Sequence, residues 1–177
     1  MKNKNLTILS TIFVGLIIFT VYLYQKDNIF LNNTISKDCK GIGQSSTLAQ
    51  VNSIESKKNQ YVSASKDIFG QSTQGGEQID YSLNDQLIIK EQIFYGETGK
   101  SEASYYLSEG KVFYFIKKNT EYINSIYQDQ SGAVKKVELK EFYFNSNQEL
   151  CYWYFDKVLQ TNDQDTKELI DYLLSGL

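Results

Sequence analysis

The sequence contains no histidine, no proline and no arginine, and it has two cysteines in 177 residues. Histidine is the usual general base near neutral pH, and arginine is the usual bidentate ligand for phosphate and carboxylate groups. Two cysteines without histidine cannot complete a standard zinc site, and no C-x-x-C pattern occurs. We therefore expect no metal, no cofactor and none of the common catalytic constellations.

An excess of positive charge is also missing. The chain carries 18 basic and 21 acidic side chains. Of these, 16 lysines and all 21 acids follow position 24, which gives that part of the chain a net charge of −5. The lysines are scattered along the sequence. We expect neither nucleic acid nor nucleotide as a partner.

The N-terminus does contain a long apolar run. Lys2 and Lys4 precede 19 uncharged residues from Leu6 to Tyr24, enough for a helix of about 28 Å against a hydrocarbon core of about 30 Å. The lack of a small-residue cleavage site favours an uncleaved signal-anchor over residues 1–24. The positive charges at its start predict a single-pass protein of the cytoplasmic (inner) membrane with an extracytoplasmic C-terminal domain, or, if cleaved, a secreted or periplasmic one.

The two cysteines, Cys39 and Cys151, are candidates for one disulfide, because exported proteins keep such bonds. A bridge would tie the segment after the anchor to the rest of the domain. Two separate thiols remain the alternative, with Cys151 buried in a strand.

Three regions are predicted: the anchor, a polar linker over 25–46, and an exported domain over 47–177. A capping-box pattern at Thr47 and Gln50 predicts a short amphipathic helix up to about Val62, and the same signature predicts a second helix over Thr161–Leu177. Residues 63–76 look like a loop.

Between these helices the sequence is rich in Tyr, Phe, Ile and Val. Three stretches share one layout of strand, polar turn and strand, with turns at Asn84-Asp85, Glu109-Gly110 and Ser146-Asn147. They predict an α+β fold with three β-hairpin repeats, about six antiparallel strands, flanked by an N-terminal and a C-terminal helix.

The segment from Leu87 to Phe155 resembles a group of uncharacterised bacterial exported proteins. The residues that carry the resemblance are Tyr95–Lys100 (YGETGK), Tyr105–Leu107, Val112–Phe115, Glu141–Phe144, and Leu150 with Trp153. The resemblance implies aromatic β-hairpins and export. It implies no activity, because none is assigned to that group.

Two patterns bear on catalysis. The string Gly96–Ser101 (GETGKS) is like the end of a phosphate-binding loop, but Phe94 stands where the pattern needs glycine, and a strand follows instead of a helix. A carboxylate pair could act without histidine, yet no spacing singles out a pair among the candidates Asp80, Glu91, Glu102, Glu138, Glu141 and Asp156.

An aromatic stripe is the best candidate for binding. Aromatic side chains offer a large contact area at low entropic cost, and the long loop Lys118–Lys135 could be a further recognition element. The alternative is that the rings form the core. The possible binding surface consists of Tyr105, Tyr106, Tyr114, Tyr143, Tyr152 and Trp153.

Together these features predict a membrane-anchored cell-envelope binding or structural module without catalysis, whose partner is an envelope protein or a glycan. The alternative is a small exported hydrolase that uses a carboxylate or Ser-Lys pair. A pilin-like subunit is a weaker third hypothesis, because a polar linker interrupts the chain after Tyr24.

Overall fold

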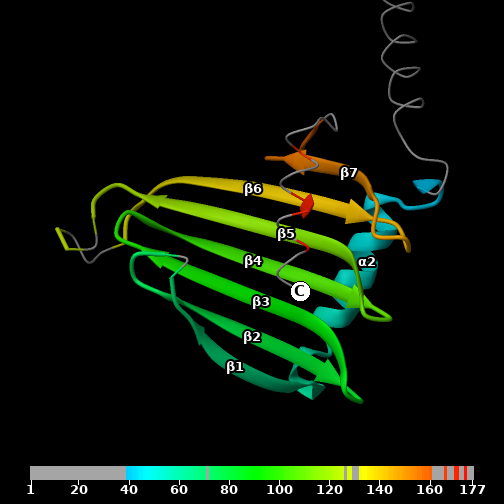
Figure 1. Ribbon diagram of the computed structural model, residues 1–177. Coiled ribbons are helices and arrows are strands. Elements are labelled where there is room, and N and C mark those ends of the chain that lie inside the picture. The colour runs from blue at the N-terminus through cyan, green and yellow to red at the C-terminus, as the bar shows by residue number, and fades with distance from the viewer. Residues whose placement is uncertain are drawn as a thin grey trace, which may run out of the picture. The chain divides into compact units, whose positions relative to one another are not determined.

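In the described part of the chain, eight antiparallel strands lie in the sheet in the same order as in the sequence, so every connection joins neighbouring strands (Figure 1). The computed structural model describes residues 39–70, 72–125, 127–128 and 132–160, together with Thr166, Ile170, Asp171 and Leu174. The strands are β1 (Val62–Ile68), β2 (Gly76–Leu83), β3 (Gln86–Gly96), β4 (Gly99–Ser108), β5 (Lys111–Tyr122), β6 (Val134–Phe144), β7 (Leu150–Phe155) and β8 (Val158–Leu159).

Two of the predicted hairpin turns have the backbone that a two-residue connection needs. Asn84 and Asp85 have φ angles of 51° and 63°, and Glu109 and Gly110 have 53° and 75°. A tight hairpin turn requires positive φ, which asparagine, aspartate and glycine adopt at low cost. These turns fix the register of β2 with β3 and of β4 with β5.

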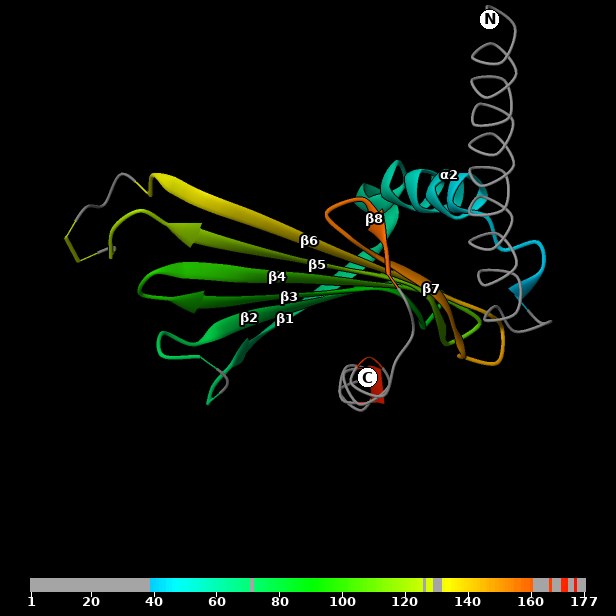
Figure 2. The ribbon, with the colours of Figure 1, turned by 90° about the horizontal axis from the view of Figure 1, so that it is seen from above.

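The helix α2 (Gln44–Glu55) lies across the sheet near one end, and a short 3₁₀ helix, η2 (Lys58–Gln60), follows it (Figure 2). The N-terminus of α2 is held by Gly43, whose backbone N–H donates to Ser46 Oγ at 3.2 Å. The capping box predicted at Thr47 is therefore wrong: the helix starts earlier, and Thr47 is buried beside Val51 on its inner side.

Each face of the sheet carries a cluster of buried apolar residues. On the helix face, the aromatic ladder runs Tyr106–Tyr114–Tyr143, with ring centroids 5.6 and 5.0 Å apart, and packs with Val51 of α2. A register shift after Tyr106 places Phe113 on this face as well, which accounts for consecutive aromatic residues in β5.

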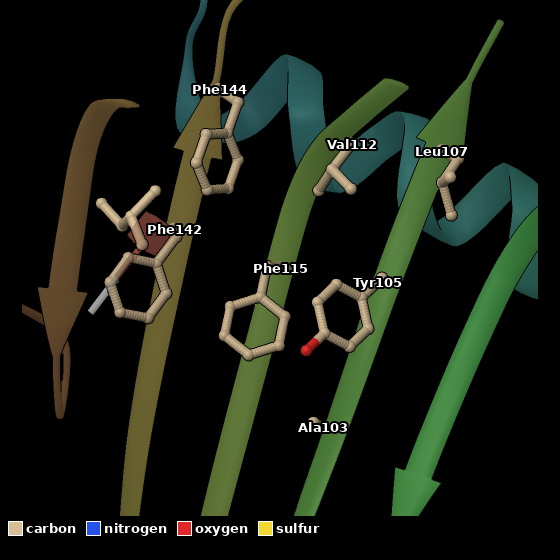
Figure 3. Packing of buried hydrophobic residues seen from close by; sticks show 8 residues of the cluster. Ala103, Tyr105, Leu107, Val112, Phe115, Phe142 and Phe144 are labelled. Atoms are coloured by element: carbon tan, nitrogen blue, oxygen red, sulfur yellow. The ribbon is translucent and has the colours of Figure 1, made fainter. Parts of the chain in front are cut away.

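The opposite face has a second ladder, Tyr105–Phe115–Phe142, with centroids 4.5 and 5.5 Å apart (Figure 3). Ile170 from the C-terminal segment packs into this cluster. Because each fully buried ring contributes roughly 1.5–3 kcal/mol, these two ladders supply much of the free energy that stabilises the sheet.

The predicted fold class is wrong in its strand count and its flanking helices. The glycines Gly70, Gly75 and Gly76 predict a loop over 63–76, but β1 occupies the first part of this range. It is an edge strand whose side chains are almost all exposed, so no apolar alternation is needed. YGETGK joins β3 to β4 as a further hairpin. The N-terminal helix ends at Glu55, and most of the predicted C-terminal helix lies outside the described residues.

The predicted single-pass inner-membrane location is not supported. In the described part of the chain no helix is long and apolar enough to cross a membrane; α2 has 12 residues and is polar on most of its surface. The expected anchor, Leu6–Tyr24, and most of the linker lie outside the described residues.

Candidate functional site

The six aromatic residues predicted as a binding surface do not share one surface. Tyr105, Tyr106, Tyr114 and Tyr143 are at most 6% exposed. Tyr105 belongs to the opposite face and the other three belong to the helix face. The two half-buried members, Tyr152 and Trp153, also pack into different faces.

The tyrosine hydroxyls of the helix face bond to carboxylates inside the protein. Tyr114 Oη donates to Glu141 Oε1 at 2.7 Å, Tyr143 Oη donates to the same oxygen at 3.3 Å, and Tyr106 Oη donates to Glu55 at 2.7 Å. Burial, reinforced by these acceptors, raises the pKa of Tyr106 and of Tyr114. The hydroxyls of Tyr114 and Tyr143 therefore provide hydrogen bonds to the buried carboxylate of Glu141, and the hydroxyl of Tyr106 connects the sheet to Glu55 of α2.

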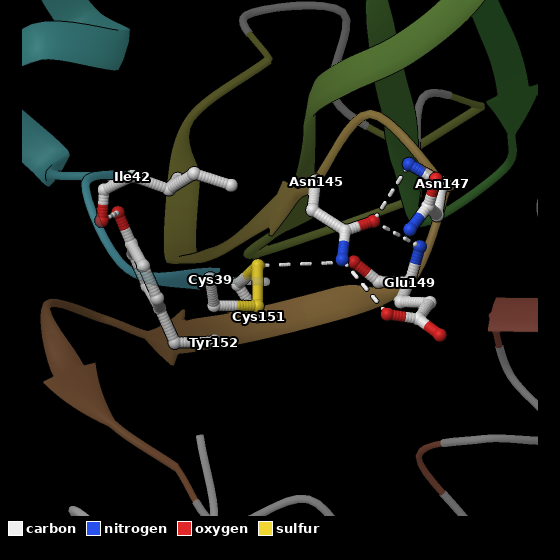
Figure 4. The surroundings of a disulfide bond; sticks show 7 residues. All are labelled: Cys39, Ile42, Asn145, Asn147, Glu149, Cys151 and Tyr152. Carbon is white, nitrogen blue, oxygen red and sulfur yellow. Dashed lines mark hydrogen bonds between the residues drawn. A yellow bond between two sulfur atoms is a disulfide. The ribbon is translucent and has the colours of Figure 1, made fainter. Parts of the chain in front are cut away.

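The predicted disulfide is confirmed: Cys39 and Cys151 are bonded, with their Cα atoms 5.5 Å apart (Figure 4). Tyr152 Oη, next along β7, donates to the carbonyl of Ile42 at 3.1 Å. The bond and this contact hold the start of the described chain against β7. Such a bond forms and persists in an oxidising environment.

A cleft of about 350 Å³ lies close to the disulfide, between the start of α2 and the β4–β5 and β6–β7 turns. Its polar side chains make structural bonds: Ser46 bonds to Gly43, and Lys111 Nζ donates to the carbonyl of Ser146 at 2.8 Å. Glu109 and Lys111 are the two ionisable residues among its described lining residues. These residues are Gly41, Ile42, Ser46, Thr47, Gln50, Ser108, Glu109, Lys111, Val112, Phe113, Phe144, Asn145 and Ser146.

A Ser-Lys mechanism needs a lysine that gives up its proton near neutral pH. Lys58 lines a second cleft together with Ser56 and Ser63, but its Nζ lies 2.5 Å from Glu91 Oε1. Burial lowers the pKa of Lys58, while the hydrogen bond to Glu91 and the charges of Glu91 and Glu55 outweigh it and raise the pKa overall. Lys58 therefore stays protonated and is a poor general base.

The six candidate carboxylates each serve a different local contact. Glu102 pairs with Lys100 and Lys118, Glu138 pairs with Lys136, and Asp156 accepts from the backbone N–H of Leu139. Asp80 accepts from Gln78, while Glu91 and Glu141 have the partners given above. Among these described contacts, no two of the six carboxylates share a hydrogen-bonding partner.

Several exposed apolar side chains lie at or near the end of the sheet that α2 does not cover, although others, such as Val62 and Val158, lie elsewhere. The uncovered end carries the β1–β2, β3–β4 and β5–β6 connections (Figure 2). Phe69 is 80% exposed, Tyr127 73%, Ile123 59% and Tyr95 40%. We call these four residues the loop rim.

Hydrogen bonds between the connections hold the loop rim together. Gln74 in the β1–β2 connection donates through its side chain to Tyr127 Oη at 2.9 Å and through its backbone to the carbonyl of Tyr95 at 3.3 Å. Tyr122 N–H donates to the carbonyl of Thr98 at 2.8 Å. These bonds link the three connections to one another.

Sequence reasoning finds only part of this surface. The loop Lys118–Lys135, predicted as a recognition element, contains Ile123 and Tyr127, although β5 continues to Tyr122 and β6 starts at Val134. Phe69 and Tyr95 are missed. The available signal is a large apolar residue next to a glycine, as in Phe69-Gly70 and Tyr95-Gly96.

Comparison with protein-family models, with curated proteins and with solved structures finds no match to this chain. What the described residues define is a disulfide-bonded antiparallel β-meander with a covering helix. The resemblance of Leu87–Phe155 to uncharacterised exported proteins stays a prediction.

Proposed function

We propose that this chain is a non-catalytic binding module that recognises a protein partner through the loop rim. The observation that carries the proposal is the exposure of Phe69, Ile123 and Tyr127 on connected loops at the uncovered end of a rigid sheet. Large apolar side chains held in contact with water are costly unless a partner covers them, and such patches commonly mark interaction sites.

A protein is a better fit than a glycan. Two of the four rim residues, Phe69 and Ile123, have no hydrogen-bonding side-chain group, whereas a sugar presents many hydroxyls that need partners. Aromatic side chains combined with aliphatic ones are typical of the buried centre of a protein interface. The experiment described next would also detect a glycan partner.

Site-specific photo-crosslinking in the full-length chain tests the proposal. We expect Phe69 or Tyr127, each replaced by p-benzoylphenylalanine, to give a discrete crosslinked protein in the host cell. Val62 and Val158 are matched controls, because they are 75% and 62% exposed but lie outside the rim. Equal crosslinking from Val62 would overturn the assignment of the rim, and a crosslinked product without protein would point to a glycan.

A second variant links crosslinking to the rim surface itself. With the probe at position 127, Ile123→Ser should reduce the crosslinked product at least tenfold, because it removes apolar contact area. The isoleucine side chain makes no hydrogen bond that the substitution could break. Val158→Ser should leave the product unchanged. An unchanged product in Ile123→Ser would show that contact at position 127 is incidental.

A further inference from the structure

The cleft beside the disulfide has the size and the lining of a site for a small molecule. Its volume of about 350 Å³ lies at the lower end of the range that is typical of ligand pockets, roughly 300–1,000 Å³. Part of its lining is apolar, and Ile42 and Phe113 are only half-buried. This apolar surface is therefore open to a ligand. The apolar lining residues are Ile42, Val112, Phe113 and Phe144.

Two side chains of opposite charge line the same cleft. Glu109 belongs to the β4–β5 turn, and Lys111 is the first residue of β5. Both are exposed. They form no ion pair with each other, and no described residue forms an ion pair with either of them. Each is therefore available to a group of opposite charge on a ligand.

The β6–β7 turn holds Lys111 in place. Lys111 Nζ donates to the carbonyl of Ser146 at 2.8 Å, a contact that orients the ammonium group and leaves its charge in place. The turn is ordered by the buried side chain of Asn145, whose Oδ1 accepts from the backbone N–H groups of Asn147 and Glu149, each at 2.9 Å (Figure 4). A group that is positioned in advance loses less conformational entropy when a ligand binds.

The disulfide fixes another side of the cleft. Gly41 and Ile42 line this side and follow Cys39 closely in the chain. The N–H of Ile42 donates to the carbonyl of Cys39 at 3.2 Å, and Cys39 is bonded to Cys151 of β7. This side of the cleft is therefore tied to the sheet in the oxidised chain.

We propose that this cleft binds a small apolar zwitterion, a free amino acid or a dipeptide. Its ammonium group lies on Glu109, its carboxylate on Lys111, and its side chain against Phe113. The two charges select this class of ligand: a simple anion would meet the like charge of Glu109 and a simple cation that of Lys111, whereas a zwitterion pairs with both. Hydrogen bonds between charged groups are the stronger ones, and the apolar lining favours an apolar side chain.

This site goes beyond the proposed protein-binding function and does not depend on it. The cleft is formed by the start of α2 and the β4–β5 and β6–β7 turns, whereas the loop rim lies on the β1–β2, β3–β4 and β5–β6 connections. Loss of crosslinking at the rim and loss of ligand binding in the cleft can therefore be observed separately.

Calorimetric titration of the full-length, oxidised chain tests the site. The probes are L-phenylalanine and glycyl-L-phenylalanine, and the tighter of the two identifies the ligand as an amino acid or a dipeptide. It is then compared with its N-acetylated form, which lacks the ammonium group, and with its C-terminal amide, which lacks the carboxylate. We expect each of these forms to bind at least tenfold more weakly. No binding of either zwitterion, or equal binding of all three forms, would overturn the proposal.

Two variants assign the charges one by one. Glu109→Gln should weaken binding of the zwitterion at least tenfold and leave binding of the N-acetylated form unchanged, because that form has no ammonium group to lose a partner. Lys111→Gln should have the same effect on the zwitterion and none on the amide. Unaltered binding of the zwitterion in either variant would overturn the proposal.

Glu97→Gln and Lys135→Gln are the matched controls. Both residues are exposed and lie outside the cleft, Glu97 in the β3–β4 turn and Lys135 near the start of β6. Both variants should bind the zwitterion as the unmodified chain does. A loss in the controls equal to that in Glu109→Gln and Lys111→Gln would reduce the effect to net charge and overturn the assignment.

Amide chemical shifts locate the bound ligand. Addition of the zwitterion should shift the amide resonances of Ile42, Gly110 and Ser146, which lie in or beside the cleft, and leave those of Tyr95 and Tyr127 in the loop rim unchanged. Shifts confined to the loop rim would place the ligand elsewhere and overturn the proposal.

Discussion

Gly99, the first residue of β4, occupies a position where no side chain fits. A Cβ atom there would collide with the carbonyl oxygen of Thr120 on β5. The obstacle is backbone, so it cannot rotate away, and one of the two strands would have to shift. Gly99 belongs to the string that is like a phosphate-binding loop, but its role in this structure is close packing of two strands.

We expect Gly99→Ala to lower the free energy of unfolding by about 1–3 kcal/mol, measured by urea unfolding of the oxidised chain. Gly110→Asn is the control: Gly110 has a φ of 75°, a Cβ atom there would meet nothing within 4 Å, and asparagine tolerates that backbone. Its effect should stay within about 0.5 kcal/mol. Equal effects of the two substitutions would contradict the steric explanation.

At the scale of elements, the junction between η2 and the sheet depends on an ion pair. Lys58 of η2 bonds to Glu91 of β3, and its ammonium group also lies 4.5 Å from the centre of the Tyr81 ring. The buried residues of α2 are Thr47 and Val51. Leu48 and Ile54 of α2 also pack against the helix-face cluster. Polar contacts at the C-terminal end of α2 add to this attachment.

We expect Glu91→Gln to cost about 1–2 kcal/mol, because it removes the nearer carboxylate of a half-buried ammonium group and leaves only that of Glu55, 3.8 Å away. Glu121→Gln removes the partner of an exposed ion pair with Lys135, 2.6 Å long, and should leave the free energy of unfolding almost unchanged, because water screens such a pair. Urea unfolding measures both, and hydrogen exchange should show faster exchange in α2 for Glu91→Gln alone. If α2 exchanges at its original rate, η2 does not anchor it.

The disulfide joins two elements that are separated by 112 residues. In the chain-entropy model, a bond that closes a loop of this length contributes about 4–5 kcal/mol through the unfolded state. We expect the double variant Cys39→Ser with Cys151→Ser to lose about 3–5 kcal/mol of unfolding free energy, and the unmodified chain to lose the same amount in reductant. A loss below about 1 kcal/mol in both measurements would mean that the contact of Tyr152 with Ile42 holds this junction without the bond.

At the scale of the whole molecule, the structural features that can be predicted from the sequence are those that a few specific residues determine. The turns at Asn84-Asp85 and Glu109-Gly110 and the pairing of Cys39 with Cys151 are predictable, because turn residues and cysteines constrain geometry directly. β1 is not predictable from apolar alternation, because an exposed edge strand buries neither face.

The candidate sites are harder to predict than the fold. Six aromatic residues in neighbouring strands divide between two buried ladders, because successive residues of a strand face opposite ways. Glu109 and Lys111 line a cleft only because the start of α2 and the β6–β7 turn lie beside the β4–β5 turn. An arrangement of this kind is a property of the complete fold, so no single segment of the sequence contains it.

The buried tyrosines make the whole molecule sensitive to alkali. Burial raises the pKa of Tyr152 to about 12, and it raises the pKa of Tyr106, Tyr114 and Tyr143 further. In the unfolded chain these groups lose their protons near pH 10. The folded state therefore binds more protons above about pH 10, and its stability falls as the pH rises from about 10 toward the folded-state pKa values.

The pKa shifts of two lysines have the opposite effect on stability, at a lower pH. Burial lowers the pKa of Lys90 and of Lys117 in the folded state, so both add stability as the pH rises toward their unfolded pKa of about 10.4. Above that pH they contribute nothing further. The four tyrosines, at most about 1.4 kcal/mol per pH unit each, then dominate, and we expect cooperative unfolding between about pH 10 and about pH 12.

Circular dichroism and tyrosinate absorbance, recorded immediately after a pH jump, test this expectation, because unfolding and ionisation of the buried tyrosines should occur together. Tyr152→Phe should make the pH dependence shallower by about 1.4 kcal/mol per pH unit at most. Full ionisation of the tyrosines near pH 10 in a chain that keeps its β-sheet spectrum would contradict the burial of the helix-face ladder. In that case the hydroxyls of Tyr106, Tyr114 and Tyr143 would be exposed to water, and these tyrosines would again be candidates for a binding surface.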